Sequence, residues 1–422
     1  MTLLETSTPQ HRNTVRVLFY GQSITEQKWS NQVADWLRAN YPNANLIIEN
    51  RAIGGHSSQL LWRTAEADLY PFQPDLLIFH VYGSHIDYER IIRNVLERTT
   101  AEVLLQSDHI TKPEELAEPA SLPTPTMSNW SAWWNQVFQP DLVKRLGHIE
   151  YLDQRTQWRQ YLNENHLTPS QLLRDGVHLN DWGCRVMAQL VEQHFVYHPN
   201  EAKSFRQVKD FTPKWTGNRL ELEFTGTRID LIPLTTDVGK KVKVTIDGKT
   251  PSSIPSLYAV SRASAWPGTN WPLILRTTAK QCLQLEDWTV RFHNASEDGK
   301  NFAFDVVGSK TGPDGEGRSD TPFVSKSGRV AIEPEDWNLA YCKAVFKSAI
   351  PEDLKATWTV VPHFLDSVKF AIGTNPTVES SVTIAQGLSN GPHKVVLEAE
   401  PGTRPTLKSI RVYSPPLVPE KS

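Results

Sequence analysis

Two short segments of the chain carry residue types that could perform nucleophilic hydrolysis. Segment 21–25 (GQSIT) contains Ser23, and the distant segment 175–180 (DGVHLN) contains Asp175 and His178. A serine hydroxyl becomes a nucleophile when a histidine accepts its proton, and a carboxylate on the other ring nitrogen fixes the imidazole tautomer. Ser23, His178 and Asp175 are therefore the candidate catalytic residues.

The elements around Ser23 would expose its hydroxyl. Residues 15–20 (VRVLFY) form an apolar run typical of a buried strand, and apolar residues four apart predict a helix after it: Trp29, Val33 and Leu37. Ser23 would then lie where a strand passes into a helix, and the first N–H groups of a helix are unpaired and can stabilise an oxyanion. The alternative is that Ser23 or Thr25 merely caps the helix.

With these residues in place, the chain resembles the SGNH (GDSL-like) hydrolase family. Segment 21–23 is similar to the first sequence block of that family, with Gln22 where the family usually has Asp. Segment 50–57 (NRAIGGHS) looks like the second block, and segment 175–178 matches the fourth. The resemblance covers about residues 14–198.

The resemblance implies both a fold and a site. It implies a parallel, flavodoxin-like three-layer α/β domain and a serine esterase that uses a Ser-His-Asp triad without a metal or cofactor. The backbone N–H groups of Ser23 and Gly55 would stabilise the oxyanion. The alternative for Gly54 and Gly55 is that they are turn glycines, because Gly-Gly commonly marks a loop.

The third block departs from the family. After the strand-like residues 76–81, the family has Gly-x-Asn-Asp, whereas this chain reads GSHID at 83–87. The family's Asn donates to the oxyanion, and His85 can do so only from a protonated ring nitrogen. His85 is therefore a candidate oxyanion donor or sugar-binding residue, and the alternative is a loop residue satisfied by a neighbour.

Strand-like and helical segments alternate through the first half of the chain. Strands are predicted near 15–20, 45–49, 75–82, 101–107 and 149–153, with helical patterns near 26–40, 57–70, 88–99, 128–147 and 181–196. This alternation predicts a parallel sheet covered on both faces, and ligands bind at the carboxyl ends of such strands. The residues expected at that edge are Ser23, Gly55, His85 and Asp108.

A long connection follows the fourth predicted strand. Asp108 and His109 open it as pocket candidates, although a loop-capping pair is the alternative. Residues 109–127 contain four prolines and precede Trp130, Trp133 and Trp134, which is typical of a lid or specificity loop. The tryptophans could reach the pocket or bury a helix face. The substrate-binding candidates are Gln22, Gly54, Asp108, His109 and Trp130.

The sequence pattern changes in the second half of the chain. Short alternating strands with Gly, Pro and Asn between them predict a β-sandwich, similar to the jelly-roll modules that accompany carbohydrate esterases of the family. We expect a polar tail at 1–13, a hydrolase domain at 14–200, a β-sandwich region at 201–415 and a tail at 416–422. Residues 251–372 form an insertion, either an elaboration of the sandwich or a second β unit, with a loop at 308–319.

Composition excludes several classes of protein. The 422 residues carry a formal net charge of -3, which gives no general attraction to nucleic acid or to an acidic membrane. There is no apolar run long enough to span a bilayer and no signal-peptide core, so we expect a cytoplasmic protein, or a periplasmic or secreted one if an export signal lies outside this sequence. Cys184, Cys282 and Cys342 fit neither a disulfide framework nor a zinc site and are expected to be buried thiols.

The leading hypothesis is a serine esterase that hydrolyses an acyl ester, expected to be O-acetyl, on a carbohydrate. The 14 tryptophans are weakly consistent with sugar stacking, including Trp266, Trp271, Trp288 and Trp337 in the β half. Two alternatives remain open. The chain could be a glycoside hydrolase that uses Asp87, Glu89 and Asp108, or a glycan-binding protein with a decayed site.

Overall fold

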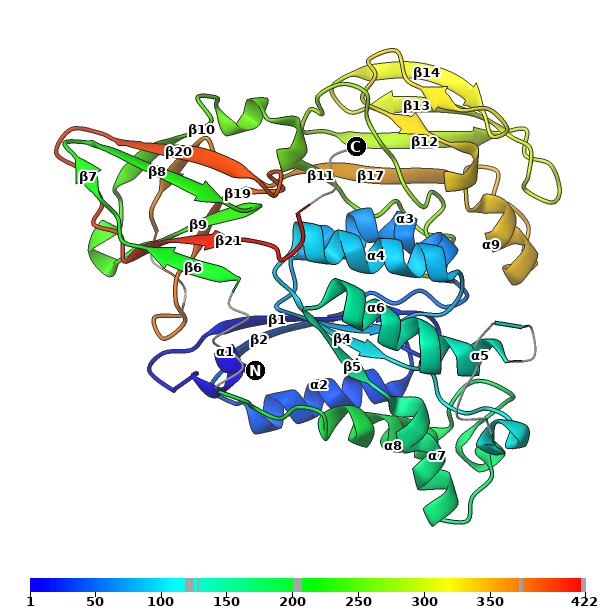
Figure 1. Ribbon diagram of the computed structural model, residues 1–422. Helices are drawn as coiled ribbons and strands as arrows, with labels where there is room; N and C mark the ends of the chain where they lie inside the picture. Colours follow the sequence, from blue (N-terminus) through cyan, green and yellow to red (C-terminus); the bar gives the residue numbers. More distant parts are fainter. Residues whose placement is uncertain (118–124, 127–128, 200–206, 372, 374, 419–422) are drawn as a thin grey trace.

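A computed structural model describes residues 1–117, 125–126, 129–199, 207–371, 373 and 375–418. An α/β unit forms the first half of the chain, and antiparallel β-sheets form the second half, as Figure 1 shows. The predicted fold class, a parallel α/β domain followed by a β-sandwich region, is confirmed.

Five parallel strands form the sheet of the α/β unit. Their order is β2-β1-β3-β4-β5, which is the flavodoxin-like order. The point where the order in which strands are added to the sheet reverses lies between β1 and β3. Most of the residues in these strands are apolar because both faces of the sheet are covered. The strands are β1 (Thr14–Gly21), β2 (Asn45–Asn50), β3 (Leu76–His80), β4 (Glu102–Gln106) and β5 (Ile149–Leu152).

Helices cover both faces of this sheet (Figure 1). Side chains of β1 alternate, so that Leu18 and Tyr20 enter one core while Val17 and Phe19 enter the other. The first core contains residues of α3 (Ser58–Asp68), α4 (His85–Arg98) and α6 (Gln139–Leu146). The second contains residues of α2 (Lys28–Asn40), α7 (Gln154–Glu164) and α8 (Asp181–Glu192).

The residues expected to be tails are partly packed. The N-terminal residues include the short helix α1 (Thr2–Glu5), whose Leu4 is buried, and the Arg12 guanidinium donates to the carbonyls of Asn43 and Ala44. Near the other end, the N–H of Leu417 donates to the carbonyl of Leu96. These two segments therefore add contacts to the α/β unit.

The sandwich is made of two antiparallel sheets that share one core. The first has the order β18-β10-β20-β8-β7 and the second β19-β9-β21-β6. Their strands are β6 (Val208–Phe211), β7 (Trp215–Thr216), β8 (Arg219–Thr225), β9 (Arg228–Ile232), β10 (Lys241–Ile246), β18 (Ser367–Lys369), β19 (Val382–Gln386), β20 (Pro392–Ala399) and β21 (Ser409–Tyr413).

A further sheet lies between β10 and β18 in the sequence, and we call residues 258–362 the inserted β unit. Its strands form a sheet of their own, in the order β11-β17-β12-β13-β14. It is therefore a second β unit and not an extension of either sandwich sheet. Its elements are β11 (Tyr258–Val260), β12 (Asp287–His293), β13 (Ala303–Gly308), β14 (Gly312–Arg318), β15 (Phe323–Val324), β16 (Ala331–Ile332), α9 (Leu339–Phe346) and β17 (Lys355–Pro362). The loop predicted at 308–319 is wrong because most of it is β14.

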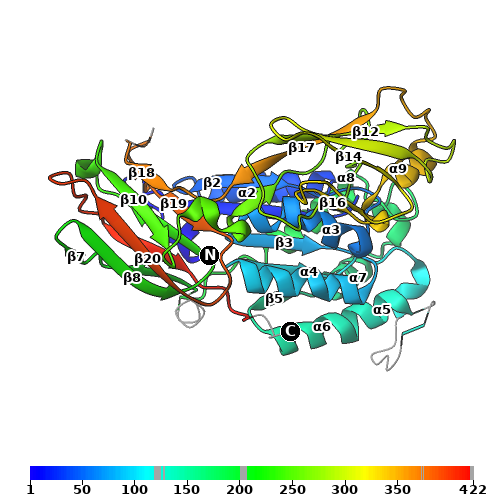
Figure 2. The same cartoon turned by 90° about the horizontal axis from the view of Figure 1, so that it is seen from above.

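The inserted β unit rests on the α/β unit. Its buried residues belong to the same hydrophobic core as those of α3 and α4. Ion pairs add to this contact, with Arg262 at 2.8 Å from Asp68 and Arg63 at 3.0 Å from Asp336. In Figure 2 the sandwich lies to one side of the α/β unit, and the inserted β unit overlaps the α/β unit.

Candidate active site

Ser23 lies in the turn between β1 and α2. The carbonyl of Gln22 accepts hydrogen bonds from the N–H groups of Thr25, at 2.9 Å, and Glu26, at 3.1 Å. This compact turn leaves Ser23 half-buried at the carboxyl edge of the sheet. The Thr25 side chain donates to the carbonyl of His80, and no side chain caps α2 in the structure.

The structure brings Ser23, His178 and Asp175 together. His178 Nε2 lies 2.9 Å from Ser23 Oγ, and His178 Nδ1 lies 3.0 Å from Asp175 Oδ2 and 3.2 Å from Oδ1. Asp175 only accepts, so Nδ1 carries the proton and the lone pair of Nε2 faces the serine hydroxyl. This is the arrangement in which His178 could act as a general base toward Ser23.

The carboxylate of Asp175 also shapes the loop. Its Oδ1 accepts from the N–H groups of Val177, at 2.8 Å, and His178, at 2.7 Å. These backbone hydrogen bonds, with that of the His178 ring, lower the pKa of Asp175 to about 2. The carboxylate is therefore ionised at neutral pH and orients the ring.

Gln27 is a site residue that no sequence motif singles out. Its Nε2 donates to the carbonyl of Leu179 at 2.9 Å, and its Oε1 accepts from the N–H of Leu179 at 3.1 Å. Both bonds join the start of α2 to the residue after His178. Gln27 thereby links the two segments that carry the candidate catalytic residues.

The structure places the two predicted pocket residues Asp108 and His109 in supporting positions. His109 is buried, its ring contacts Trp158, and its Nε2 donates to the carbonyl of Val177 at 2.8 Å. Asp108 accepts from Asn135 and lies 3.4 Å from the buried Arg155. His109 therefore contacts the loop that carries His178, whereas Asp108 contacts Asn135 and Arg155.

The Gly54–Gly55 turn lies against the nucleophile. A Cβ built on Gly54 would be 3.6 Å from Ser23 Cβ and 2.6 Å from Glu26 Oε2. Gly55 has φ +73, and a Cβ there would be 2.6 Å from the Trp271 ring. A side chain at position 55 would therefore be both strained and obstructed. Gly55 itself is the residue after the glycine that faces Ser23, and its role as a backbone donor remains a prediction.

His85 lies in an aromatic cluster, which we define by its ring contacts as Tyr82, His85, Trp130, Trp133, Trp134 and Phe138. Its ring centroid is 6.0 Å from that of Trp130, 5.8 Å from Trp133 and 5.7 Å from Phe138. Within the described part of the chain, no hydrogen bond connects the His85 ring to the triad. The structure therefore packs the His85 ring among aromatic side chains and not against the triad residues.

Gln22 connects this cluster to the nucleophile turn, because its Nε2 donates to the carbonyl of Tyr82 at 3.1 Å. Trp130 and Trp133 are half-buried, whereas Trp134 is buried and packs against Tyr88. Much of the predicted lid, residues 118–124 and 127–128, lies outside the described residues.

The aromatic and thiol predictions for the β half need correction. Trp266, Trp271 and Trp288 are buried, so they pack the core and cannot stack on a sugar. Cys184 and Cys342 are buried as expected, but Cys282 is exposed.

Among the described residues, there is no group of three or more His, Cys, Asp or Glu side chains able to hold a metal ion, and no helix is long and apolar enough to cross a membrane.

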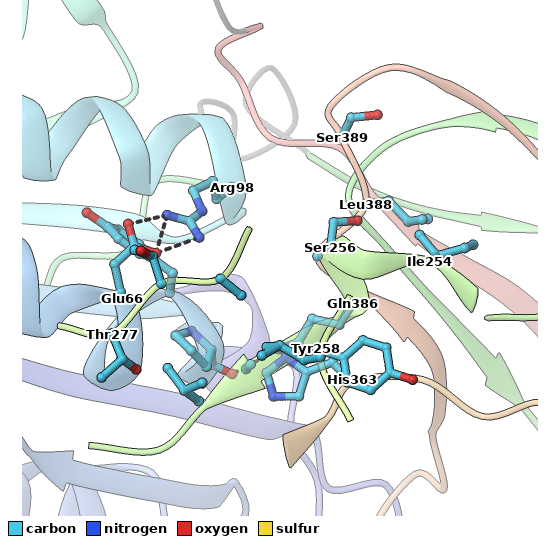
Figure 3. A pocket seen from close by; sticks show the side chains of 18 of the residues that line it. Glu66, Arg98, Ile254, Ser256, Tyr258, Thr277, His363, Gln386, Leu388 and Ser389 are labelled. Atoms are coloured by element: carbon cyan, nitrogen blue, oxygen red, sulfur yellow. Dashed lines mark hydrogen bonds and ion pairs between the residues drawn. The ribbon is translucent and has the colours of Figure 1, made fainter. Parts of the chain in front are cut away.

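A cavity of about 700 Å³ lies elsewhere, at the junction of the α/β unit, the sandwich and the inserted β unit. Figure 3 shows the Glu66–Arg98 ion pair on one side of it and Tyr258, His363 and Gln386 on the other. None of the triad residues lines this cavity. The candidate catalytic residues therefore lie apart from this cavity.

Comparisons with known proteins leave the family open. No family model matches the chain, and no curated protein matches it. A solved catalytic mutant of Axe2, an acetylxylan esterase from Geobacillus stearothermophilus, is 15% identical with a TM-score of 0.37, and the match covers 45% of this chain and 97% of that one. A two-domain esterase active on acetylated mannans is 13% identical with a TM-score of 0.35, covering 96% and 92%. The acetyl xylan esterase AlAXEase is 20% identical with a TM-score of 0.35, covering 43% and 100%.

Proposed function

We propose that this chain is a serine esterase of the SGNH (GDSL-like) type that removes an acyl group, expected to be O-acetyl, from a carbohydrate. The observation that supports it is the line of hydrogen bonds from Ser23 Oγ through His178 to Asp175. A nucleophile, a base and an orienting carboxylate in hydrogen-bond contact are the parts that acyl transfer needs. We assign the reaction to residues 14–200 and a supporting role to residues 201–415.

The reaction would proceed in two halves. Ser23 Oγ attacks the acyl carbon while His178 Nε2 takes the hydroxyl proton, which gives a tetrahedral intermediate whose oxyanion binds the N–H groups of Ser23 and Gly55. Collapse breaks the bond to the sugar oxygen, which receives the proton from His178. A water molecule then attacks the acyl-serine with His178 as base, and the carboxylic acid and free Ser23 result.

The aromatic cluster supports a carbohydrate substrate. Tyr82 is 41% exposed and its ring contacts that of Trp134, which in turn contacts Trp130. The rings of His85, Trp130 and Trp133 are half-buried. Flat aromatic faces combine an apolar body with a polar edge, which suits the faces and hydroxyls of a sugar ring. The hydrogen bond from Gln22 to the Tyr82 carbonyl joins the turn of Ser23 to the backbone of one member of this cluster.

The ion pairs of the acidic residues disfavour the glycoside hydrolase alternative. Asp87 pairs with Arg90, Glu89 with Arg93 and Arg145, and Asp108 with Arg155. Hydrogen bonds from Arg145 and Arg93 lower the pKa of Glu89, whereas a glycosidase acid needs a raised pKa. The hydrogen-bonded triad likewise disfavours a decayed site.

Labelling of Ser23 tests the proposal. The protein is incubated with a serine-directed phosphonate, and the modified peptide is found by mass spectrometry; activity is measured on p-nitrophenyl acetate, acetylated oligosaccharides and aryl glycosides. We expect labelling at Ser23, ester hydrolysis only, and a loss on the order of 10³ or more in Ser23→Ala. Ser348→Ala, an exposed serine in the inserted β unit, is the control. Full activity in Ser23→Ala would refute the esterase proposal.

A further inference from the structure

The inserted β unit reaches the turn that holds the candidate oxyanion donor. Tyr341 Oη donates to the carbonyl of Gly55 at 2.9 Å, and Asn338 Nδ2 donates to His56 Nε2 at 3.2 Å. The ring of Trp271 contacts that of His56 with centroids 4.6 Å apart. These three residues come from 271–341, more than two hundred positions after the turn.

The tautomer of His56 follows from its partners. Asn338 Nδ2 also donates to the carbonyl of Pro272 at 2.8 Å, and a carbonyl only accepts, so the amide nitrogen and not the oxygen faces both Pro272 and His56. His56 Nε2 is therefore an acceptor, and the proton is on Nδ1. Nδ1 lies 3.1 Å from the carbonyl oxygen of Gly54 and donates to it.

The bond from His56 to Gly54 also determines the direction of the Gly55 N–H. The carbonyl of Gly54 and the N–H of Gly55 belong to one planar trans peptide unit and point to opposite sides of it. When His56 holds the carbonyl, the N–H must point the other way. His56 has no exposed surface, and burial lowers its pKa to about 4, so the ring is neutral at working pH.

Tyr341 and Trp271 restrict the same turn from the other side. Tyr341 holds the carbonyl of the next peptide unit, Gly55–His56. The Trp271 ring fills the space where a side chain at position 55 would lie, at 2.6 Å from the built Cβ. Both peptide units that flank Gly55 are thus held in place, one by a ring of the turn itself and one by the inserted β unit.

We propose that the inserted β unit positions the oxyanion donor of the α/β unit, with Asn338 acting through His56 on the Gly54–Gly55 peptide and Tyr341 acting on the Gly55–His56 peptide. All three are positioning residues that do not touch the reacting atoms. The inference rests on the proposed esterase function. It extends that function by making the catalytic power of residues 14–200 depend on residues 258–362.

Four variants of the full chain test it on p-nitrophenyl acetate, a substrate without a sugar. Misplacement of a donor that acts only in the transition state lowers kcat and leaves KM nearly unchanged. We expect Tyr341→Phe to lower kcat about tenfold and His56→Leu to lower it about a hundredfold. His56→Asn places an amide donor near the position of Nδ1 and should recover about tenfold of that loss.

Thr227→Val is the matched control, because Thr227 Oγ1 also donates to a backbone carbonyl of the α/β unit, that of Arg98 at 3.3 Å, but far from the turn. It should turn over the ester as fast as the parent. Parental turnover in both Tyr341→Phe and His56→Leu would overturn the inference, as would a loss in Thr227→Val equal to that in Tyr341→Phe. If His56→Leu does not fold, the turnover of Tyr341→Phe decides whether the inference holds. Tyr341 is 37% exposed, so its substitution should not unfold the protein.

Failure of the esterase proposal looks different: the parent itself would hydrolyse no ester and its Ser23 would not be labelled.

Discussion

The Nε2 atom of the buried His109 lies 2.8 Å from the carbonyl oxygen of Val177. Val177 directly precedes His178, so this one hydrogen bond joins the end of β4 to the loop that carries the candidate base. His109 is thus placed to support the loop that carries His178. Steady-state kinetics of His109 variants can distinguish this role from that of a substrate ligand.

We predict that His109→Leu lowers kcat about tenfold on p-nitrophenyl acetate with KM within about twofold, because the His178 loop loses its support. His109→Gln, whose amide can donate in place of Nε2, should regain part of the loss. Steady-state kinetics on the small ester and on an acetylated oligosaccharide check this. A rise in KM confined to the oligosaccharide would instead mean that His109 binds the sugar.

Substitution of the three triad residues should lower activity to different extents. His178→Ala is expected to be as damaging as Ser23→Ala, because the two act as one unit, whereas Asp175→Asn should cost about one to two orders of magnitude less. An asparagine keeps an oxygen for the N–H groups of Val177 and His178 but loses the charge.

The protonation of Asp175 is a sharper test. The pKa of Asp175 is lowered to about 2, so its stabilising effect is complete above its ordinary pKa of about 3.9 and is lost as pH falls toward 2. The carboxylate should therefore stay ionised from pH 5 to 8, and an NMR titration of its carboxyl carbon should show no protonation in that range. Protonation above pH 5 would mean that the carboxylate is not ionised as described.

The stability of the protein should decrease on mild acidification through His56. Its folded-state pKa of about 4 lies below the ordinary value of 6.5, owing to burial and to the nearby Arg262. The unfolded chain therefore binds a proton first, so the free energy of unfolding falls as pH decreases from 6.5 to 4, by about 3 kcal/mol from this group. Burial lowers the pKa of His80 and His109 as well, and they act in the same direction.

Denaturant unfolding at pH 7 and at pH 4.5 measures this effect. The decrease should be smaller in His56→Asn than in the parent, and the difference between the two isolates the contribution of His56 from those of the other buried histidines. An equal decrease in both proteins would show that His56 is not the proton-binding group.

His85 offers a choice between two roles. Because its ring contacts Trp130 and Trp133, we predict that His85→Ala raises KM for an acetylated oligosaccharide severalfold and leaves p-nitrophenyl acetate hydrolysis within about twofold. If turnover of the small ester instead fell about a hundredfold or more, and His85→Asn partly restored it, His85 would belong to the oxyanion hole.

Much of the α/β unit could be predicted from the sequence because its strands are buried on both faces and read as apolar runs. The helix α7 gives no clear helical pattern, since two of its four buried residues, Gln154 and Arg155, are polar and only Trp158 and Leu162 are apolar. The strand β14 reads as a loop because it is rich in Gly and contains Pro313, residues that an edge strand tolerates.

Some residues of the candidate site could likewise be predicted from the sequence, and others could not. Ser23, Asp175 and His178 lie in short segments whose residue types suggest chemistry by themselves. Asn338 and Tyr341 carry no such signal, because an asparagine and a tyrosine on a short helix have many ordinary roles. Their relation to Gly54 and Gly55 depends on how the inserted β unit packs, which is a tertiary contact that no local pattern contains. Gln27 gives no sequence signal for the same reason.

The pairing of β11 with β17 has a consequence for how the chain folds. Tyr258 lies opposite Pro362 in that pair, so the inserted β unit begins and ends at adjacent points. The sandwich must join β10 to β18 and β20 across this long segment, and closing a long flexible loop is entropically costly and slow. Once β11 and β17 have paired, the effective loop becomes short. The inserted β unit therefore acts as an internal clip, and we expect the sandwich to become ordered only after, or together with, this unit.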